Sequence, residues 1–172
     1  MAVKASKYVT RRTAKPVPNQ KLAIVFDIDE TTLSNLSMIQ GNGFGYNPKL
    51  WNEWINEGRA PAILPVQALY ETAVRHGVSV FFITSRLEST RAATERNLRT
   101  VGYDAWANVF LRTKEDLRTT RQYKTGARQE IEAAGYILSP TSATRTATSP
   151  AATPSASSSC RIRSISCTER PV

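Results

Sequence analysis

The chain has 172 residues, a length that suits one globular domain, with 41% hydrophobic and 22% charged residues. No apolar run is long enough to cross a membrane, and no signal peptide is visible, so a cytoplasmic location is expected for the chain as written. One histidine and two cysteines exclude a histidine-rich zinc site, a four-cysteine zinc ribbon and a disulfide scaffold.

The net charge of +9 is confined to the two ends of the chain. Residues 1–21 carry six basic residues and no acid, and residues 139–172 carry four arginines and one glutamate. The middle, 22–138, is neutral, with 13 basic and 13 acidic residues. Because a nucleic-acid-binding domain concentrates positive charge on a folded face, this distribution disfavours a nucleic-acid partner and is typical of solvated tails.

Elements predicted in chain order alternate between strands and helices. A polar basic leader at 1–21 can begin with a short helical turn, and nothing in it demands a packed partner. The pattern then predicts strands at 22–26, 78–84 and 108–111, helices at 65–76, 88–101 and 122–134, and a further strand from 136. Gly77, Gly102 and Gly135 are placed to end the three helices. Strands that are apolar on both faces and separated by helices predict an α/β fold with a parallel sheet covered by helices.

The last segment, 139–172, differs from the rest of the chain. Fifteen of its 34 residues are Ser or Thr, four are Pro, and it contains both cysteines. This composition cannot bury enough apolar surface to offset the loss of chain entropy, so a disordered tail is predicted.

The strongest chemical signal is FDIDETTLS at 26–34, where the first strand ends. In a parallel sheet, working residues gather just past the carboxyl ends of the strands. Asp27 can serve as a nucleophile that forms an acyl phosphate, Asp29 can donate and recover a proton, and Thr31 can hold phosphate oxygens. Such a site requires a hard cation such as Mg²⁺, because the anionic carboxylate must approach an anionic phosphoryl group. The alternative is that both acids only cap the next segment.

Two further signals follow later strands and helices. Thr84, Ser85 and Arg86 end the second strand, where a hydroxyl and an N–H can bind phosphate opposite Asp27; the alternative is that Ser85 caps the next helix. Lys124 begins the third predicted helix, where the helix dipole does not favour a cation, which hints at an anionic ligand; the alternative is an exposed lysine.

In this order the motifs resemble the haloacid dehalogenase (HAD) superfamily, in particular the acid phosphatases of subfamily IIIB. The matching segments are FDIDETTLSN at 26–35, the W-x-x-W segment and its downstream proline at 51–65, FFITSR at 81–86, RAATERNLRTVGY at 91–103 and YKTGARQEIEAAGY at 123–136. The resemblance covers about residues 20–138. It implies a HAD-type, Rossmann-like parallel sheet flanked by helices, with a small cap insertion after the first strand.

The resemblance also implies roles for individual residues. Asp27 would be the nucleophile, Asp29 the acid/base, Thr84 the phosphate-binding hydroxyl and Lys124 the phosphate-stabilising cation. Mg²⁺ would be held by the Asp27 side chain and the Asp29 main-chain carbonyl. The expected activity is hydrolysis of small phosphomonoesters. One alternative is a non-catalytic phosphate-binding or storage-type relative; such relatives can lack the nucleophilic aspartate, and its presence here favours an enzyme. The other is a nucleic-acid 3′-phosphatase, which the neutral middle disfavours.

An aromatic segment at 44–54 lies between the first strand and the first helix. In the family this insertion walls the substrate pocket, so Tyr46 and Trp51 are candidates for stacking on a nucleobase or an aryl group. Trp54 is predicted to pack into the domain instead.

The family's fourth motif, of the type G-D-x-x-S-D, is missing after the last predicted strand; no Asp follows Asp116, and Glu169 is the only acid in the tail. Consider a shifted reading frame, in which each new codon consists of the third base of one codon and the first two bases of the next. From Pro140 onward, this frame permits the sequence NVGDQDSDLAGGYAERVFKLPNPIY, a family-like ending. We therefore hypothesise a frameshift; the alternative is a genuinely divergent tail. The chain as written is expected to bind Mg²⁺ weakly, to be of low stability and to turn over poorly.

Overall fold

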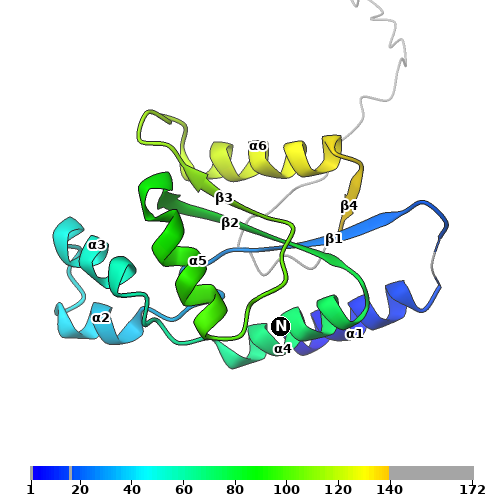
Figure 1. Cartoon of the computed structure of the whole chain (residues 1–172), viewed down its shortest axis with the longest axis horizontal. Helices are drawn as coiled ribbons and strands as arrows, with labels where there is room; N and C mark the ends of the chain where they lie inside the picture. Colours follow the sequence, from blue (N-terminus) through cyan, green and yellow to red (C-terminus); the bar gives the residue numbers. More distant parts are fainter. Residues whose placement is uncertain (1, 16, 140–172) are drawn as a thin grey trace, which may run out of the picture.

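A parallel sheet forms the centre of the computed structural model, which describes residues 2–15 and 17–139 (Figure 1). Within that part the strands are β1 (Lys21–Phe26), β2 (Ser79–Leu87), β3 (Asn108–Arg112) and β4 (Tyr136–Leu138), in the order β3-β2-β1-β4. Every pairing is parallel, with Phe26 opposite Phe82 in the central pair. The predicted α/β class with a parallel sheet is confirmed. The predicted tail lies outside the described residues.

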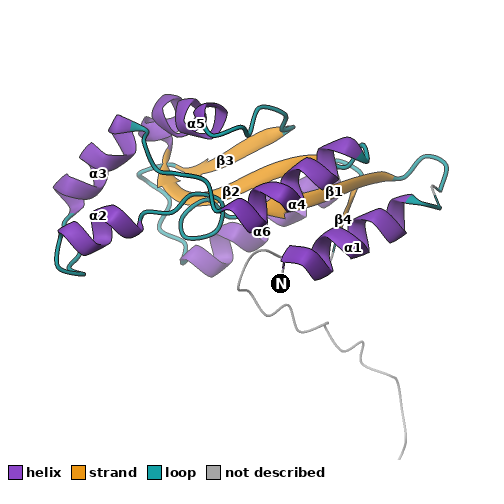
Figure 2. Cartoon of the chain, turned by 90° about the horizontal axis from the view of Figure 1, so that it is seen from below, coloured by secondary structure: helices purple, strands orange, loops and turns teal. Residues whose placement is uncertain are grey.

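Helices cover both faces of this sheet (Figure 2). The side chains of β1 alternate, so that Ile24 and Phe26 enter one core and Ala23 and Val25 the other. The first, larger core packs against α1, α4 and α5, and the second against α6. These elements are α1 (Ala2–Thr13), α4 (Leu64–Arg75), the 3₁₀ turn η1 (Glu88–Thr90), α5 (Arg91–Thr100) and α6 (Thr120–Ala133). The three glycines predicted to end helices adopt φ of +67°, +90° and +85°, the left-handed region that suits a helix C-terminus.

The basic leader differs from its prediction. It forms the three-turn helix α1, and Val9 on its inner face is 2% exposed and belongs to the larger core. The helix lies beside α4 (Figures 1 and 2). Lys4, Lys7 and Arg11 lie within one narrow arc of the helix and are exposed, so the charge faces solvent while the small residues pack. The leader is therefore longer than a short helical turn, and it has a packed partner that its sequence did not demand.

An insertion of two short helices follows β1. Helices α2 (Leu36–Gly41) and α3 (Pro48–Glu57) lie beyond the carboxyl ends of the strands, on the left in Figure 1. Asn47 begins α3, because its side chain accepts hydrogen bonds from the Lys49 and Leu50 amides, and Gly58 ends it at φ +63°. This insertion occupies the position of the predicted cap. No helix of the described part is long and apolar enough to span a membrane.

Candidate active site

Two acids lie where β1 ends, and they face different partners. Asp27 continues the strand alternation on the side of Val25 and α6, whereas Asp29 follows in a turn that closes on Leu33. In this turn the amides of Thr31, Thr32 and Leu33 all donate to the Ile28 carbonyl. Neither acid caps a helix: Asn35 occupies the N-cap position of α2. The two carboxylates are thus presented at the sheet edge by a tight turn.

Asp27 forms an ion pair with Lys124 from α6. The distance from Lys124 Nζ to Asp27 Oδ2 is 2.5 Å, and the two side chains are 10% and 21% exposed. The other carboxylate oxygen accepts the Ile28 amide at 2.9 Å. Lys124 is held there because its neighbours Tyr123 and Ala127 pack into the smaller core. The predicted nucleophile and the predicted cation are therefore adjacent.

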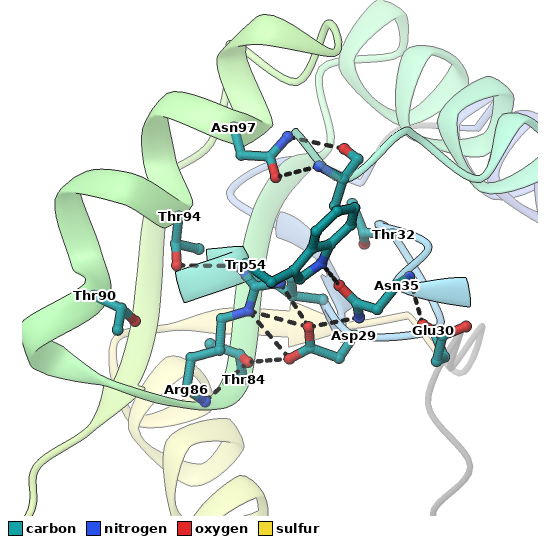
Figure 3. Close-up of polar contacts among 12 residues, drawn as sticks. Asp29, Glu30, Thr32, Asn35, Trp54, Thr84, Arg86, Thr90, Thr94 and Asn97 are labelled. Atoms are coloured by element: carbon teal, nitrogen blue, oxygen red, sulfur yellow. Dashed lines mark hydrogen bonds and ion pairs between the residues drawn. The ribbon is translucent and has the colours of Figure 1, made fainter. Parts of the chain in front are cut away.

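Asp29 forms its ion pair with Arg86 from β2 (Figure 3). Arg86 Nη2 lies 2.6 Å from Asp29 Oδ1, and its Nε reaches both carboxylate oxygens at 3.1 and 3.2 Å. The guanidinium is further fixed by donation to Thr94 on α5. Arg86 is only 3% exposed, and its guanidinium holds Asp29; the substrate-binding role that the sequence indicated for it stays a prediction.

Side chains on either side of Arg86 point alternately to the two faces of the sheet, because β2 continues to Leu87, beyond the predicted end of the strand. Thr84 is fully buried; its hydroxyl lies 3.4 Å from Asp29 Oδ2 and accepts the Arg86 amide. Ser85 points to the opposite face, is exposed, and lies 3.5 Å from the Thr120 hydroxyl at the start of α6. Ser85 caps no helix. The predicted phosphate-binding pair is thus divided between the Asp29 side and the Asp27 side of the sheet.

Two threonines of the turn have different environments. Thr31, the predicted phosphate-binding hydroxyl, is half-buried, and its amide is used by the turn. Thr32, which the sequence analysis did not single out, is fully buried and donates its hydroxyl to the Asp27 carbonyl at 2.6 Å. Thr32 therefore fixes the backbone that carries the nucleophile candidate.

Other contacts near the acids were not predicted from the sequence. Asn35 donates to Asp29, and Trp54 of α3 donates to Asn35 (Figure 3). Arg128 lies one turn after Lys124 and donates to its carbonyl. Burial lowers the pKa of the Arg128 guanidinium, while the negative charge of Asp27 acts in the opposite direction. The four-residue spacing from Lys124 was the only signal for Arg128 in the sequence.

The aromatic segment is divided by burial. Trp54 is 8% exposed and packs into the larger core, as predicted. Tyr46 is 77% exposed in the loop before α3, and Trp51 is half-buried on that helix. Neither Tyr46 nor Trp51 forms a hydrogen bond with Asp27 or Asp29 in the described part of the chain.

The model of the HAD superfamily, subfamily IIIB (acid phosphatase), matches residues 1–140. The chain belongs to this family. Among curated relatives, the stem 28 kDa glycoprotein of Glycine max is 36% identical over 123 residues, covering 69% of this chain and 48% of the relative. Acid phosphatase 1 of Solanum lycopersicum is 32% identical over 118 residues, covering 66% and 46%.

A solved structure of the class C acid phosphatase from Bacillus anthracis with tungstate bound is similar in fold, with a TM-score of 0.63 and 25% identity. The match covers 80% of this chain and 58% of that one. The chain spans about half the length of the curated relatives it matches. The HAD subfamily IIIB domain expected from the motifs is therefore confirmed, over a part of the relatives' length.

HAD acid phosphatases generally use a divalent metal ion, but the described residues do not complete a site for one. A hard cation takes several oxygen ligands. Both oxygens of Asp27 are engaged by Lys124 and an amide, and those of Asp29 by Arg86 and Asn35. No group of three or more His, Cys, Asp or Glu in residues 2–15 and 17–139 could hold an ion. Of the two predicted ligands, the Asp27 carboxylate lies against Lys124, whereas Asp29 was expected to contribute its main-chain carbonyl and not the side chain that Arg86 holds.

Proposed function

We propose that this chain carries the reacting carboxylates of a phosphomonoesterase, with Asp27 as nucleophile. The observation that carries the proposal is the Asp27–Lys124 pair at 2.5 Å at the end of β1, next to a second carboxylate held separately. A lysine beside the nucleophile offsets the negative charge that repels an incoming phosphate. Membership of an acid phosphatase family supports the same reaction.

The two carboxylates have separate roles in the proposed reaction. An oxygen of Asp27 attacks phosphorus, the bond from phosphorus to the ester oxygen breaks, and Asp29 gives the leaving oxygen a proton. Water then attacks the acyl phosphate and returns a proton to Asp29, which releases inorganic phosphate and restores Asp27. Lys124, the Thr84 and Thr31 hydroxyls, Ser85 and its amide are the proposed phosphate contacts. Arg86 acts through Asp29.

The test is hydrolysis of p-nitrophenyl phosphate by the full chain and its Asp27→Asn variant. We expect turnover to disappear in Asp27→Asn, because the amide is not a nucleophile, and to persist in the control Asp104→Asn, whose carboxylate binds Tyr70 instead. Unchanged turnover in Asp27→Asn would overturn the proposal. If only phosphate binding is observed, and it survives Asp27→Asn, the non-catalytic, storage-type alternative is supported.

We also propose that Mg²⁺ is the metal and that this chain binds it weakly. Asp27 and the Asp29 carbonyl are two ligands where the ion prefers six. Turnover is therefore expected to rise with Mg²⁺ without saturating. A normal saturation curve would contradict weak binding.

The missing ligands lead to the frameshift proposal. The shifted reading of codons from Pro140 permits a G-D-x-x-S-D sequence directly after β4, whose carboxyl end lies beside β1 in the sheet. Sequencing the coding DNA tests this proposal directly: a one-base shift near residue 140 must yield the acidic motif. If no such shift does, the tail is a genuine divergence.

Nucleoside monophosphates are the proposed substrates, because Tyr46 and Trp51 can offer aromatic faces from the insertion. AMP is then expected to be hydrolysed more efficiently than a simple aliphatic phosphate. Equal efficiency for the two esters would remove the stacking hypothesis and leave the phosphatase proposal intact.

A further inference from the structure

Trp54 connects the insertion to the acid cluster. It lies on α3, is 8% exposed, and its indole Nε1 donates to Asn35 Oδ1 at 2.9 Å. The Arg59 guanidinium lies 5.1 Å above the indole ring, on the helix's C-terminal side. In Figure 3 the indole nitrogen points toward Asn35, and Asn35 points toward Asp29. Trp54, a side chain of the insertion, is thus connected to the acid/base candidate Asp29 through two successive hydrogen bonds.

Asn35 is fully buried, and its polar groups are all in use. Its backbone amide donates to Glu30 Oε1 at 2.6 Å, and its Nδ2 donates to Asp29 Oδ1 at 3.0 Å. The orientation of the side-chain amide is fixed by chemistry. The indole N–H can only donate, so it must meet the side-chain oxygen of Asn35, and this leaves Asn35 Nδ2 to donate to Asp29. The chain of donors therefore runs in one direction, from Trp54 to Asn35 to Asp29.

Asp29 is consequently held from two elements. Arg86 and Thr84 approach it from β2, and Asn35 approaches from the segment that leads into the insertion. The β2 contacts engage both carboxylate oxygens, and Asn35 adds a third donor to Oδ1. A carboxylate that transfers a proton must stay within hydrogen-bond reach of the reacting oxygen, so its orientation affects the rate.

We propose that Asn35 and Trp54 are positioning residues for Asp29, through which the α2–α3 insertion sets the orientation of the acid/base group. The proposal rests on the acid/base role given to Asp29 above. It assigns to Trp54 a function beyond packing: its indole N–H keeps the Asn35 amide from turning, and that amide keeps Asp29 in place. Neither side chain touches the reacting atoms.

The first test needs no turnover. The chain contains four aspartates, so labelling Asp with ¹³C at Cγ gives four carboxyl resonances, and the loss of one in Asp29→Asn assigns Asp29. We expect Trp54→Phe and Asn35→Ala each to move the Asp29 resonance. Trp106→Phe is the matched control: it removes an indole from the same core, where Trp106 packs against Phe82, and should leave the Asp29 resonance in place. An Asp29 resonance unmoved by Trp54→Phe would overturn the proposal.

The second test separates positioning from packing by kinetics. Trp54→Phe and Asn35→Ala are expected to lower kcat roughly 10-fold with little change in KM, because the phosphate contacts are untouched. Asn97→Ala is the control for loss of a buried asparagine, since the Asn97 side chain bonds the Ala60 backbone and no other group of the described residues; it should lower the melting temperature and leave kcat unchanged. A kcat loss in Asn97→Ala equal to that in Asn35→Ala would overturn the positioning role.

The two tests keep the two proposals apart. If the unaltered chain shows no turnover, the proposed activity of this chain fails, while the Asp29 resonance in Trp54→Phe still decides the positioning role. If Asn35→Ala does not fold, judged by circular dichroism, the smaller change in Trp54→Phe decides it.

Discussion

At the scale of single residues, Arg86 is a buried charge that depends on one carboxylate. Its side chain is 1% exposed, whereas that of Asp29 is 26% exposed. Removing one member of a buried ion pair leaves the other charge without its partner. This lowers the free energy of unfolding by more than breaking an ion pair on the surface does. Arg86 therefore links the stability of the domain to the geometry of the acid/base candidate.

Arg86→Ala is expected to lower the free energy of unfolding by about 2 kcal/mol, less than for a fully buried pair because water reaches part of Asp29. Urea denaturation followed by circular dichroism measures the change. Lys49→Ala is the control: it breaks an ion pair with Glu53 whose side chains are 84% and 53% exposed, and should cost about 0.5 kcal/mol or less. Equal losses in the two variants would show that Asp29 does not need its partner.

The acids and Lys124 were found in the sequence because strand ends and a lysine near a helix start are local patterns. The contact of Arg86 with Asp29 was not predicted, because it depends on how far β2 continues. The pattern predicted an end at Thr84, but the strand runs to Leu87, and only that extension turns Arg86 inward and Ser85 outward. The Asn35–Trp54 contact spans 19 residues, a separation that a local pattern does not report.

At the scale of elements, the start of α6 determines where Lys124 lies. No acid occurs in its first turn, so its exposed amides depend on the Thr119 and Gln122 side chains. The Thr119 hydroxyl accepts the Gln122 amide at 3.3 Å, and Gln122 Oε1 accepts the Thr119 amide at 2.9 Å. This capping box places the first turn, and Lys124 follows within one further turn.

Thr119→Ala removes the hydroxyl of the capping box and is expected to lower the free energy of unfolding by about 1 kcal/mol. Thr119→Ser keeps the hydroxyl and should stay within a few tenths of a kcal/mol of the unaltered chain. Chemical denaturation of both variants gives the comparison. A Ser variant as unstable as the Ala variant would mean that the methyl group, and not the cap, is what matters.

Helix α1 shows why one element was mispredicted. Its inner face consists largely of small residues, Ala2, Ala5 and Val9, so its apolar periodicity is weak although the i, i+3, i+7 spacing is present. Its burial comes from α4, a partner about sixty residues later in the chain. Helix α4 itself was predicted to within a residue at each end, because larger side chains such as Leu69 and Val66 mark its inner stripe.

At the scale of the whole molecule, two cores on opposite faces of one sheet bury several tyrosines. Tyr70 and Tyr103 pack edge-to-face in the larger core, and Tyr123 lies in the smaller one between α6 and the sheet. Burial raises the pKa of all three hydroxyls, and nearby Asp116 adds to the effect at Tyr123, whose pKa rises to about 12. The ordinary value for tyrosine is 10.0.

The sign of the resulting pH dependence follows from proton linkage. A tyrosine that holds its proton more tightly in the folded state contributes its full stability below pH 10, and this contribution is lost as pH rises through the folded pKa. The free energy of unfolding is therefore expected to fall between pH 10 and about 12. Urea denaturation at several pH values measures it, with tyrosinate absorbance reporting ionisation. Tyr123→Phe should flatten the fall, whereas Tyr46→Phe, which alters a side chain that is 77% exposed, should leave it unchanged. If the free energy of unfolding of Tyr123→Phe falls as steeply with pH as that of the unaltered chain, burial in the smaller core does not raise the pKa of the Tyr123 hydroxyl.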